Sequence, residues 1–107
     1  MRTFKNTSQK GSVRYIVFKE KGIWYAVALE FNIVESGEDP QLALFRLFEA
    51  MKGYLESFKK VKGARPYTLN QEVEEEYESL WNKLRAKKSI KSPYTVHSFG
   101  EQNLALI

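Results

Sequence analysis

The stretch that decides the fold is residues 23–58, IWYAVALEFNIVESGEDPQLALFRLFEAMKGYLESF. Its period changes in the middle: β-forming residues dominate at first, whereas apolar residues recur at helical spacing from Pro40 onward. Gly37 lies in the turn between, where glycine adopts a positive φ without strain. Asp39 can cap a helix through its carboxylate, and Pro40 suits the first helical position. The stretch predicts strands, a turn and a capped helix.

Three strands are expected before the turn. Residues 13–19 and 23–30 alternate and are joined by a short polar segment with glycine, which predicts a hairpin. Residues 33–36 continue as a short third strand, so the three form an antiparallel meander. The small Ala26 and Ala28 share one face of the second strand, which predicts that a helix packs closely there.

The helix is expected over residues 40–58, and its apolar surface is broad. One stripe at helical spacing comprises Ala43, Leu44, Leu47, Ala50, Met51, Tyr54 and Leu55. Leu42, Phe45, Phe48 and Phe58 widen it beyond one face. Such an arc needs a second cover, either from the later helix or from a partner chain. Gly53 within the helix marks a close crossing by another backbone.

The second half predicts a loop, a helix and a strand. Residues 59–70 read as a loop with a short edge strand around Tyr67. Asn70 is a suitable cap for a helix over 71–87. Residues 94–99 alternate and are expected to join the sheet edge as a final strand.

These elements predict an α+β fold of order β-β-β-α-α-β. A three-stranded antiparallel meander carries a packed helix, followed by a second long helix and a final strand that joins the sheet. The 107 residues fit one domain. We expect a flexible leader over residues 1–12 and a single domain over 13–107, with the last helix and strand as an extension of it.

Composition narrows the function classes. Hydrophobic residues make up 43% and charged residues 28%, as in a globular protein. The absence of cysteine excludes disulfides and thiolate metal sites and is compatible with the cytoplasm, the expected location. No apolar run is long enough to span a bilayer, so no membrane is expected. The net charge of +4 favours an acidic partner or weak contact with nucleic acid.

Catalytic patterns are missing from the sequence. His97 is the sole histidine and has no carboxylate or cysteine at metal spacing. Glu35, Glu38 and Asp39 cluster at the turn, but they fit a cap and a solvated loop better than a metal site. Phosphate-binding glycine motifs are also missing. We expect no enzyme activity, no catalytic residues, no metal and no cofactor.

Nucleic-acid binding is an alternative reading of the same residues. Tyr15, Trp24 and Tyr25, with Arg14 and Lys19, are expected on the sheet, where aromatic side chains can stack on bases. The residues of the accompanying basic patch are Lys59, Lys60, Lys62 and Arg65. The usual role of such aromatics is packing between strands, and the motif typical of RNA-binding sheets is missing.

The central stretch also follows a known family pattern. The matching positions are Tyr25 and Ala28 in the strand, Ile33, Gly37 and Glu38 in the bend and turn, and Ala43, Leu44, Leu47, Glu49 and Ala50 in the helix. Over about residues 15–56, the chain resembles the N-terminal domain of HicB-family antitoxins. The resemblance implies a partial ribonuclease-H-like β-β-β-α-β fold without a nuclease site.

The resemblance also implies partners. HicB-like proteins neutralise HicA toxins, which are small RNA-cleaving proteins, and they typically form dimers. The hypothesis is therefore a non-catalytic HicB-like interaction protein, an antitoxin of a toxin–antitoxin system that forms a homodimer. The residues expected to bind the partner are Leu42, Phe45, Phe48 and Trp24. DNA binding is not expected, because one helix and one strand follow residue 58 instead of an evident DNA-reading module.

Overall fold

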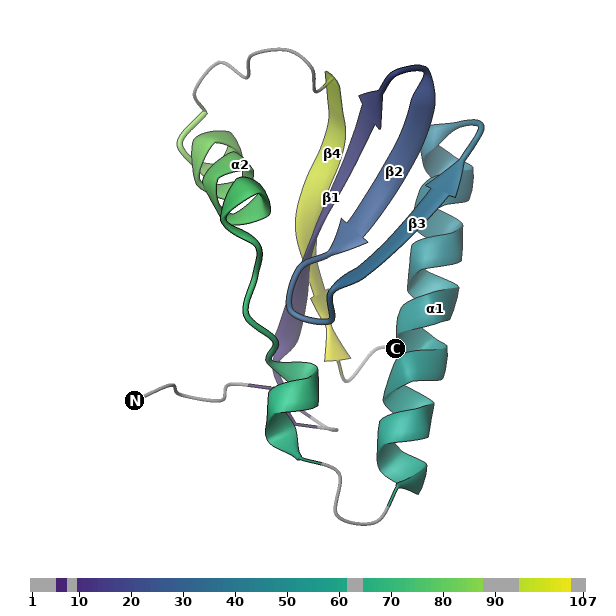
Figure 1. Ribbon diagram of the computed structural model, residues 1–107, viewed down its shortest axis with the longest axis vertical. Helices are drawn as coiled ribbons and strands as arrows, with labels where there is room; N and C mark the ends of the chain where they lie inside the picture. Colours follow the sequence, from purple (N-terminus) through teal and green to yellow (C-terminus); the bar gives the residue numbers. More distant parts are fainter. Residues whose placement is uncertain (1–5, 8–9, 62–64, 88–94, 105–107) are drawn as a thin grey trace.

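A four-stranded antiparallel sheet lies between two helices (Figure 1). The computed structural model describes residues 6–7, 10–61, 65–87 and 95–104. Its elements are β1 (Ser12–Glu20), β2 (Ile23–Ala28), β3 (Ile33–Gly37), α1 (Pro40–Lys60), the 3₁₀ helix η1 (Pro66–Leu69), α2 (Glu75–Arg85) and β4 (Thr95–Asn103). The strand order is β3-β2-β1-β4. The predicted α+β fold, including the final strand that joins the sheet, is confirmed.

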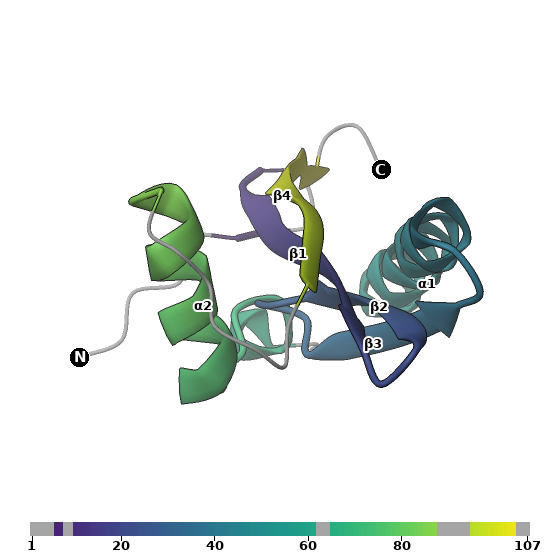
Figure 2. The ribbon, with the colours of Figure 1, turned by 90° about the horizontal axis from the view of Figure 1, so that it is seen from above.

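The two faces of the sheet carry separate cores, because side chains alternate along each strand. Figure 2 shows α1 and α2 on opposite sides of the twisted sheet. On the α1 side, Ala26 and Ala28 pack in a cluster with Leu47, Met51 and other buried residues, as their small size predicts. On the α2 side, the buried residues are Ile16, Phe18, Val27, Leu29, Leu80 and Trp81.

The start of α1 is built as the sequence predicts, except for the role of Gly37. The Asp39 carboxylate accepts a hydrogen bond from the Leu42 backbone N–H at 2.7 Å, and Pro40 begins the helix. Gly37 does not have a positive φ; a Cβ there would lie 2.8 Å from the Ala43 backbone nitrogen. The glycine is therefore needed for the close approach of β3 and α1. Gly53 is exposed, and a Cβ there would meet nothing within 4 Å, so the close crossing predicted at it is wrong.

The capping bond provides a direct test of this start. We expect Asp39→Ala to lower the free energy of unfolding by about 1 kcal/mol, because the Leu42 N–H loses its acceptor. Chemical denaturation measures the change, and Asp39→Asn, which keeps a capping oxygen, is the matched control. Equal stability of the alanine variant and the unmodified chain would contradict the assignment.

The second half differs from prediction in three places. The backbone around Tyr67 forms a 3₁₀ helix and not an edge strand. The second helix begins at Glu75, four residues after the predicted start, and it has no side-chain cap. The acidic residues in its first turn instead interact favourably with the helix dipole. The last strand extends to Asn103 because its polar end pairs with the start of β1.

Asn70 does not cap α2, because its side chain binds a distant segment. Its Oδ1 accepts from the Asn6 backbone N–H at 2.8 Å, and its Nδ2 donates to the Asn6 carbonyl at 2.9 Å. Asn6 is 3% exposed, so this residue of the predicted leader is attached to the domain. Residues 1–5 and 8–9 of that stretch lie outside the described residues. β1 begins at Ser12, one residue before the predicted start of the first strand.

The position of α2 shows which face of the sheet this helix covers. Because α2 packs on its own sheet, on the face opposite α1, it does not cover the broad apolar arc of α1. α2 is also a second helix in the connection from β3 to β4, so the chain reverses direction once more before β4. As a result, β4 runs antiparallel to β1. A single helix between β3 and β4 would leave them parallel to each other. Among the described helices, none has the length and apolar character needed to cross a membrane.

Candidate functional site

An apolar patch lies where α1 begins, and we call Ile23, Leu42 and Phe45 the α1 patch. Phe45 is 62% exposed and Ile23 is 45% exposed. Leu42 and Phe45 are three residues apart on α1, which places them on the same face of the helix. Ile23 and Leu42 both line a shallow hollow of about 420 Å³. Single exposed apolar side chains are common, but here two exposed apolar residues lie close to the partly buried Leu42, so the group is a candidate contact surface.

The residues predicted to bind a partner divide into two groups. Leu42 and Phe45 belong to the α1 patch. Phe48 instead packs edge-on against Tyr15, with ring centroids 5.5 Å apart. Trp24 packs against the core on the same face, with the Lys19 ammonium 5.7 Å from its ring centroid. Phe48 and Trp24 therefore serve mainly in packing, which alternation alone could not reveal.

The predicted basic patch is only partly described. Lys59 and Lys60 are exposed in the last turn of α1, where the helix dipole favours positive charge. Arg65 is exposed, and its backbone carbonyl accepts from the Thr68 hydroxyl at 2.8 Å. Lys62 lies outside the described residues. The helix dipole therefore explains Lys59 and Lys60 at least as well as a binding role does, whereas Arg65 lies beyond the helix.

The sheet aromatics do not form an open stacking platform in the described part of the chain. Tyr15 and Trp24 pack against the core beneath α1, and Tyr25 packs against the core beneath α2. Arg14, expected beside them as a free cation, is held by two carboxylates. Because bases need an exposed ring face to stack upon, this arrangement gives the nucleic-acid alternative no support.

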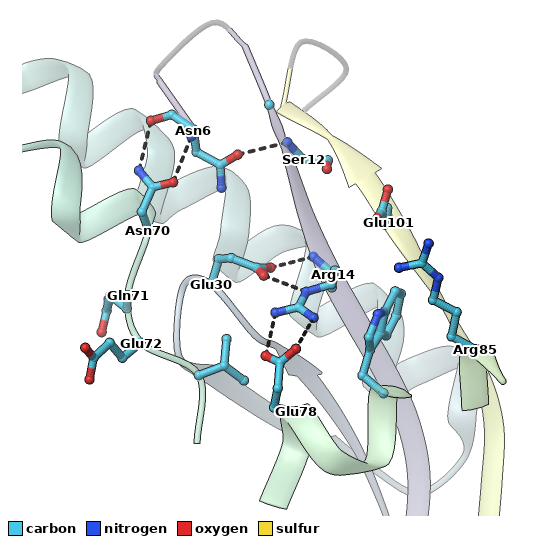
Figure 3. A pocket seen from close by; sticks show the side chains of 13 residues that line it. Asn6, Ser12, Arg14, Glu30, Asn70, Gln71, Glu72, Glu78, Arg85 and Glu101 are labelled. Atoms are coloured by element: carbon cyan, nitrogen blue, oxygen red, sulfur yellow. Dashed lines mark hydrogen bonds and ion pairs between the residues drawn. The ribbon is translucent and has the colours of Figure 1, made fainter. Parts of the chain in front are cut away.

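A polar cleft of about 640 Å³ that Arg14 lines was not predicted from the sequence (Figure 3). Arg14 of β1 lies at its centre. Its Nε is 2.6 Å from Glu30 Oε2, and its two terminal nitrogens contact both oxygens of Glu78 at 2.7 and 2.8 Å. Its guanidinium also lies 5.4 Å from the ring centroid of Trp81. The arrangement ties β1 and the turn after β2 to α2.

The hydrogen bonds between Arg14 and Glu78 shift the pKa values of both groups. Hydrogen bonds with Glu78 raise the pKa of Arg14 above its ordinary value, despite the opposing effect of burial. The same hydrogen bonds hold the pKa of Glu78 below its ordinary value. Glu30 also accepts from the Arg14 backbone N–H at 2.8 Å. Since both carboxylates already accept hydrogen bonds from Arg14, the cluster suits a structural clamp better than acid–base catalysis.

The described residues near this cluster offer few other groups for catalysis or metal binding. Tyr77, also on α2, has a raised pKa, chiefly because burial disfavours its charged form. The described residues contain no group of histidine and carboxylate side chains placed to hold a metal ion. One signal could have located the clamp: Arg14 alternates with the apolar Ile16 and Phe18 on a buried face. A cation at such a position requires partners.

The fold and its surfaces define a small α+β protein with a structural ion cluster and an apolar patch. No protein-family model matches the chain, and no curated protein or solved structure matches it either.

Proposed function

We propose that this chain is a non-catalytic HicB-like interaction protein, an antitoxin that binds a small HicA-like RNA-cleaving toxin in the cytoplasm. The observation that carries the proposal is the exposure of Phe45, one turn along α1 from Leu42, which lines a hollow together with Ile23. This α1 patch lies within the segment that resembles HicB N-terminal domains. Burial of exposed aromatic and aliphatic side chains is the usual source of affinity at protein interfaces.

The exposed charges around the α1 patch comprise three carboxylates and the Arg46 guanidinium, so acidic groups outnumber basic ones. Exposed Glu38 and Asp39 precede α1, and exposed Glu49 lies one turn after Phe45. An RNA-cleaving protein must carry positive charge to bind phosphates. Carboxylates beside an apolar patch would complement such a surface, and this complementarity would speed association. The patch thus combines an apolar centre with a partly acidic rim.

The α1 patch predicts a measurable loss of partner binding. The probe is the small basic protein encoded by a neighbouring reading frame, co-purified with the full chain and titrated by calorimetry. We expect Phe45→Asp to weaken the complex about 30-fold or more, as expected for an aromatic residue at the centre of an interface. Thermal stability should change little, because this side chain is 62% exposed.

The control is Ser57→Asp, which places the same charge on an exposed position near the other end of α1. It should leave the affinity within about twofold. Equal binding by Phe45→Asp and the unmodified chain would exclude the α1 patch as the contact surface. If no small basic protein is encoded nearby and pull-down recovers none, the antitoxin proposal fails. The homodimer expected of such a protein requires a second surface.

A further inference from the structure

The backbone pattern of β1 determines which groups of β4 face away from the sheet. The Arg14 carbonyl accepts from the Leu29 N–H at 2.9 Å, so the backbone of Arg14 faces the β2 side. In antiparallel strands, adjacent residues direct their N–H and C=O groups to opposite sides. Tyr15 therefore faces β4, where its register partner is Gly100. Gly100 faces β1 in return, and its two neighbours face outward.

The two outward-facing residues are Phe99 and Glu101. Within the described part of the chain, β4 is the outermost strand, so no strand is paired with their backbone groups. Phe99 is 42% exposed although its ring packs edge-on against Trp81. Gly100 between them remains in the strand beneath the Tyr15 hydroxyl, which lies 2.8 Å from where a glycine Cβ would be. This part of β4 is therefore a regularly paired strand at the edge of the described sheet.

The opposite edge of the sheet is protected. β3 has only five residues, Ile33–Gly37. Ser36 lies opposite Tyr25, whose backbone faces β1 by the same alternation, so the Ser36 carbonyl points away from the sheet. The Arg46 guanidinium donates to that carbonyl at 2.8 Å. Short strands and nearby cations are common devices that prevent edge pairing.

β4 lacks most of these protective devices. Its nine residues, TVHSFGEQN, include no proline or lysine, and Glu101 is the sole charged residue when His97 is neutral. The register shift between Val17 and Phe18 on β1 disrupts only the first half of the β4 ladder. The second half has regular pairing with β1. Such an edge is a ready template for another strand.

We propose that the free edge of β4 pairs with β4 of a second copy of this chain, which joins two sheets across a two-fold axis. A strand pairs with its own copy in the antiparallel direction, so the contact is closed and self-complementary. A register centred on Gly100 places Phe99 opposite Glu101 of the other copy. It keeps the two Glu101 carboxylates from facing each other directly, a destabilising arrangement.

This inference identifies a surface for the homodimer proposed above, but it does not depend on a toxin. The α1 patch and β4 belong to different parts of the fold: α1 packs beside β3, whereas β4 forms the opposite margin of the sheet (Figure 2). One copy could therefore use both surfaces. Loss of the dimer and loss of toxin binding can consequently be measured separately.

The test removes the outward-facing backbone N–H of residue 101. Sedimentation velocity of the full chain, from about 1 µM to about 1 mM, should show the mass rising from 12.5 kDa to twice that value. Glu101→Pro should stay at the monomer mass, because proline has no N–H to donate across the new contact. The bond pattern with β1 should persist, since the backbone of Glu101 faces outward.

Glu101→Thr is the matched control, because it removes the charge but retains the N–H and a strand-forming side chain. It should dimerise at least as well as the unmodified chain. Hydrogen exchange on the unmodified chain gives a second readout if the proline variant misfolds: protection of the Phe99 and Glu101 amides should increase with protein concentration. A monomer at every concentration, equal dimerisation by Glu101→Pro, or concentration-independent exchange of both amides would overturn the proposal. Glu101→Pro should still bind the toxin.

Discussion

Replacing Arg14 with methionine is expected to lower the free energy of unfolding by about 3 kcal/mol. The change keeps an apolar stem of similar length but strands two carboxylates that Arg14 engages at 2.6 to 2.8 Å. The Glu30 side chain is only 19% exposed, so water replaces the lost contact poorly. Glu78 is 40% exposed and contributes less. Urea denaturation at neutral pH measures the loss.

Arg46→Met is the matched control, because Arg46 is exposed and makes one hydrogen bond, to the Ser36 carbonyl. It should cost less than about 1 kcal/mol. If Arg14→Met loses no more stability than Arg46→Met, the structural clamp is contradicted. Combining Arg14→Met with Glu78→Gln should cost less than the sum of the two single changes, since the second removes a stranded charge.

The contribution of Glu78 also depends on pH in a defined direction. Its pKa in the folded chain lies below the ordinary value of 4.5. The stability it provides is therefore fully present above pH 4.5 and is lost as the pH falls from there through the folded-state pKa. The difference between Arg14→Met and the unmodified chain should accordingly shrink over that acidic range.

Gly37→Ala is expected to lower the free energy of unfolding by about 2 kcal/mol. The added methyl would lie 2.8 Å from the Ala43 backbone nitrogen and 3.2 Å from Leu42 Cβ. The first contact is with backbone at the start of a helix, so no change of rotamer relieves it. The start of α1 must move away from β3. This strain exceeds the benefit that alanine brings by restricting the unfolded chain.

Gly53→Ala is the natural control, because it makes the same chemical change at an exposed position inside α1. A Cβ there meets nothing within 4 Å, so the substitution should raise stability by about 1 kcal/mol through better helix propensity. Both variants can be compared in one urea series. If Gly37→Ala is as stable as the unmodified chain, the close approach of β3 and α1 does not constrain this glycine.

The central stretch was predictable because local rules and tertiary packing agree there. Alternation placed Ala26 and Ala28 on the face that α1 covers, and the chemistry of Asp39 and Pro40 identified the start of the helix. The close approach at Gly37 was not predictable, since a turn glycine and a packing glycine look alike in sequence. Its role depends on the distance to α1.

Errors in the second half arose where distant residues override local preference. Asn70 is a good helix cap by type, but its amide is bonded to Asn6, 64 residues away in the chain. The polar end of β4 lacks an apolar alternation, and its pairing with β1 makes it a strand. The clamp likewise requires Arg14, Glu30 and Glu78 from three separate segments.

The pairing of β1 with β4 has a consequence for synthesis on the ribosome. Ser12 pairs with Asn103, whereas β1 meets β2 through the two-residue turn at Lys21 and Gly22. The meander and α1 can therefore assemble on the emerging chain while one edge of β1 is still unpaired. Contacts between residues so distant in sequence form late, because a long loop must close first. During that interval β1, a central strand of the finished sheet, is itself an exposed edge open to pairing with other nascent chains.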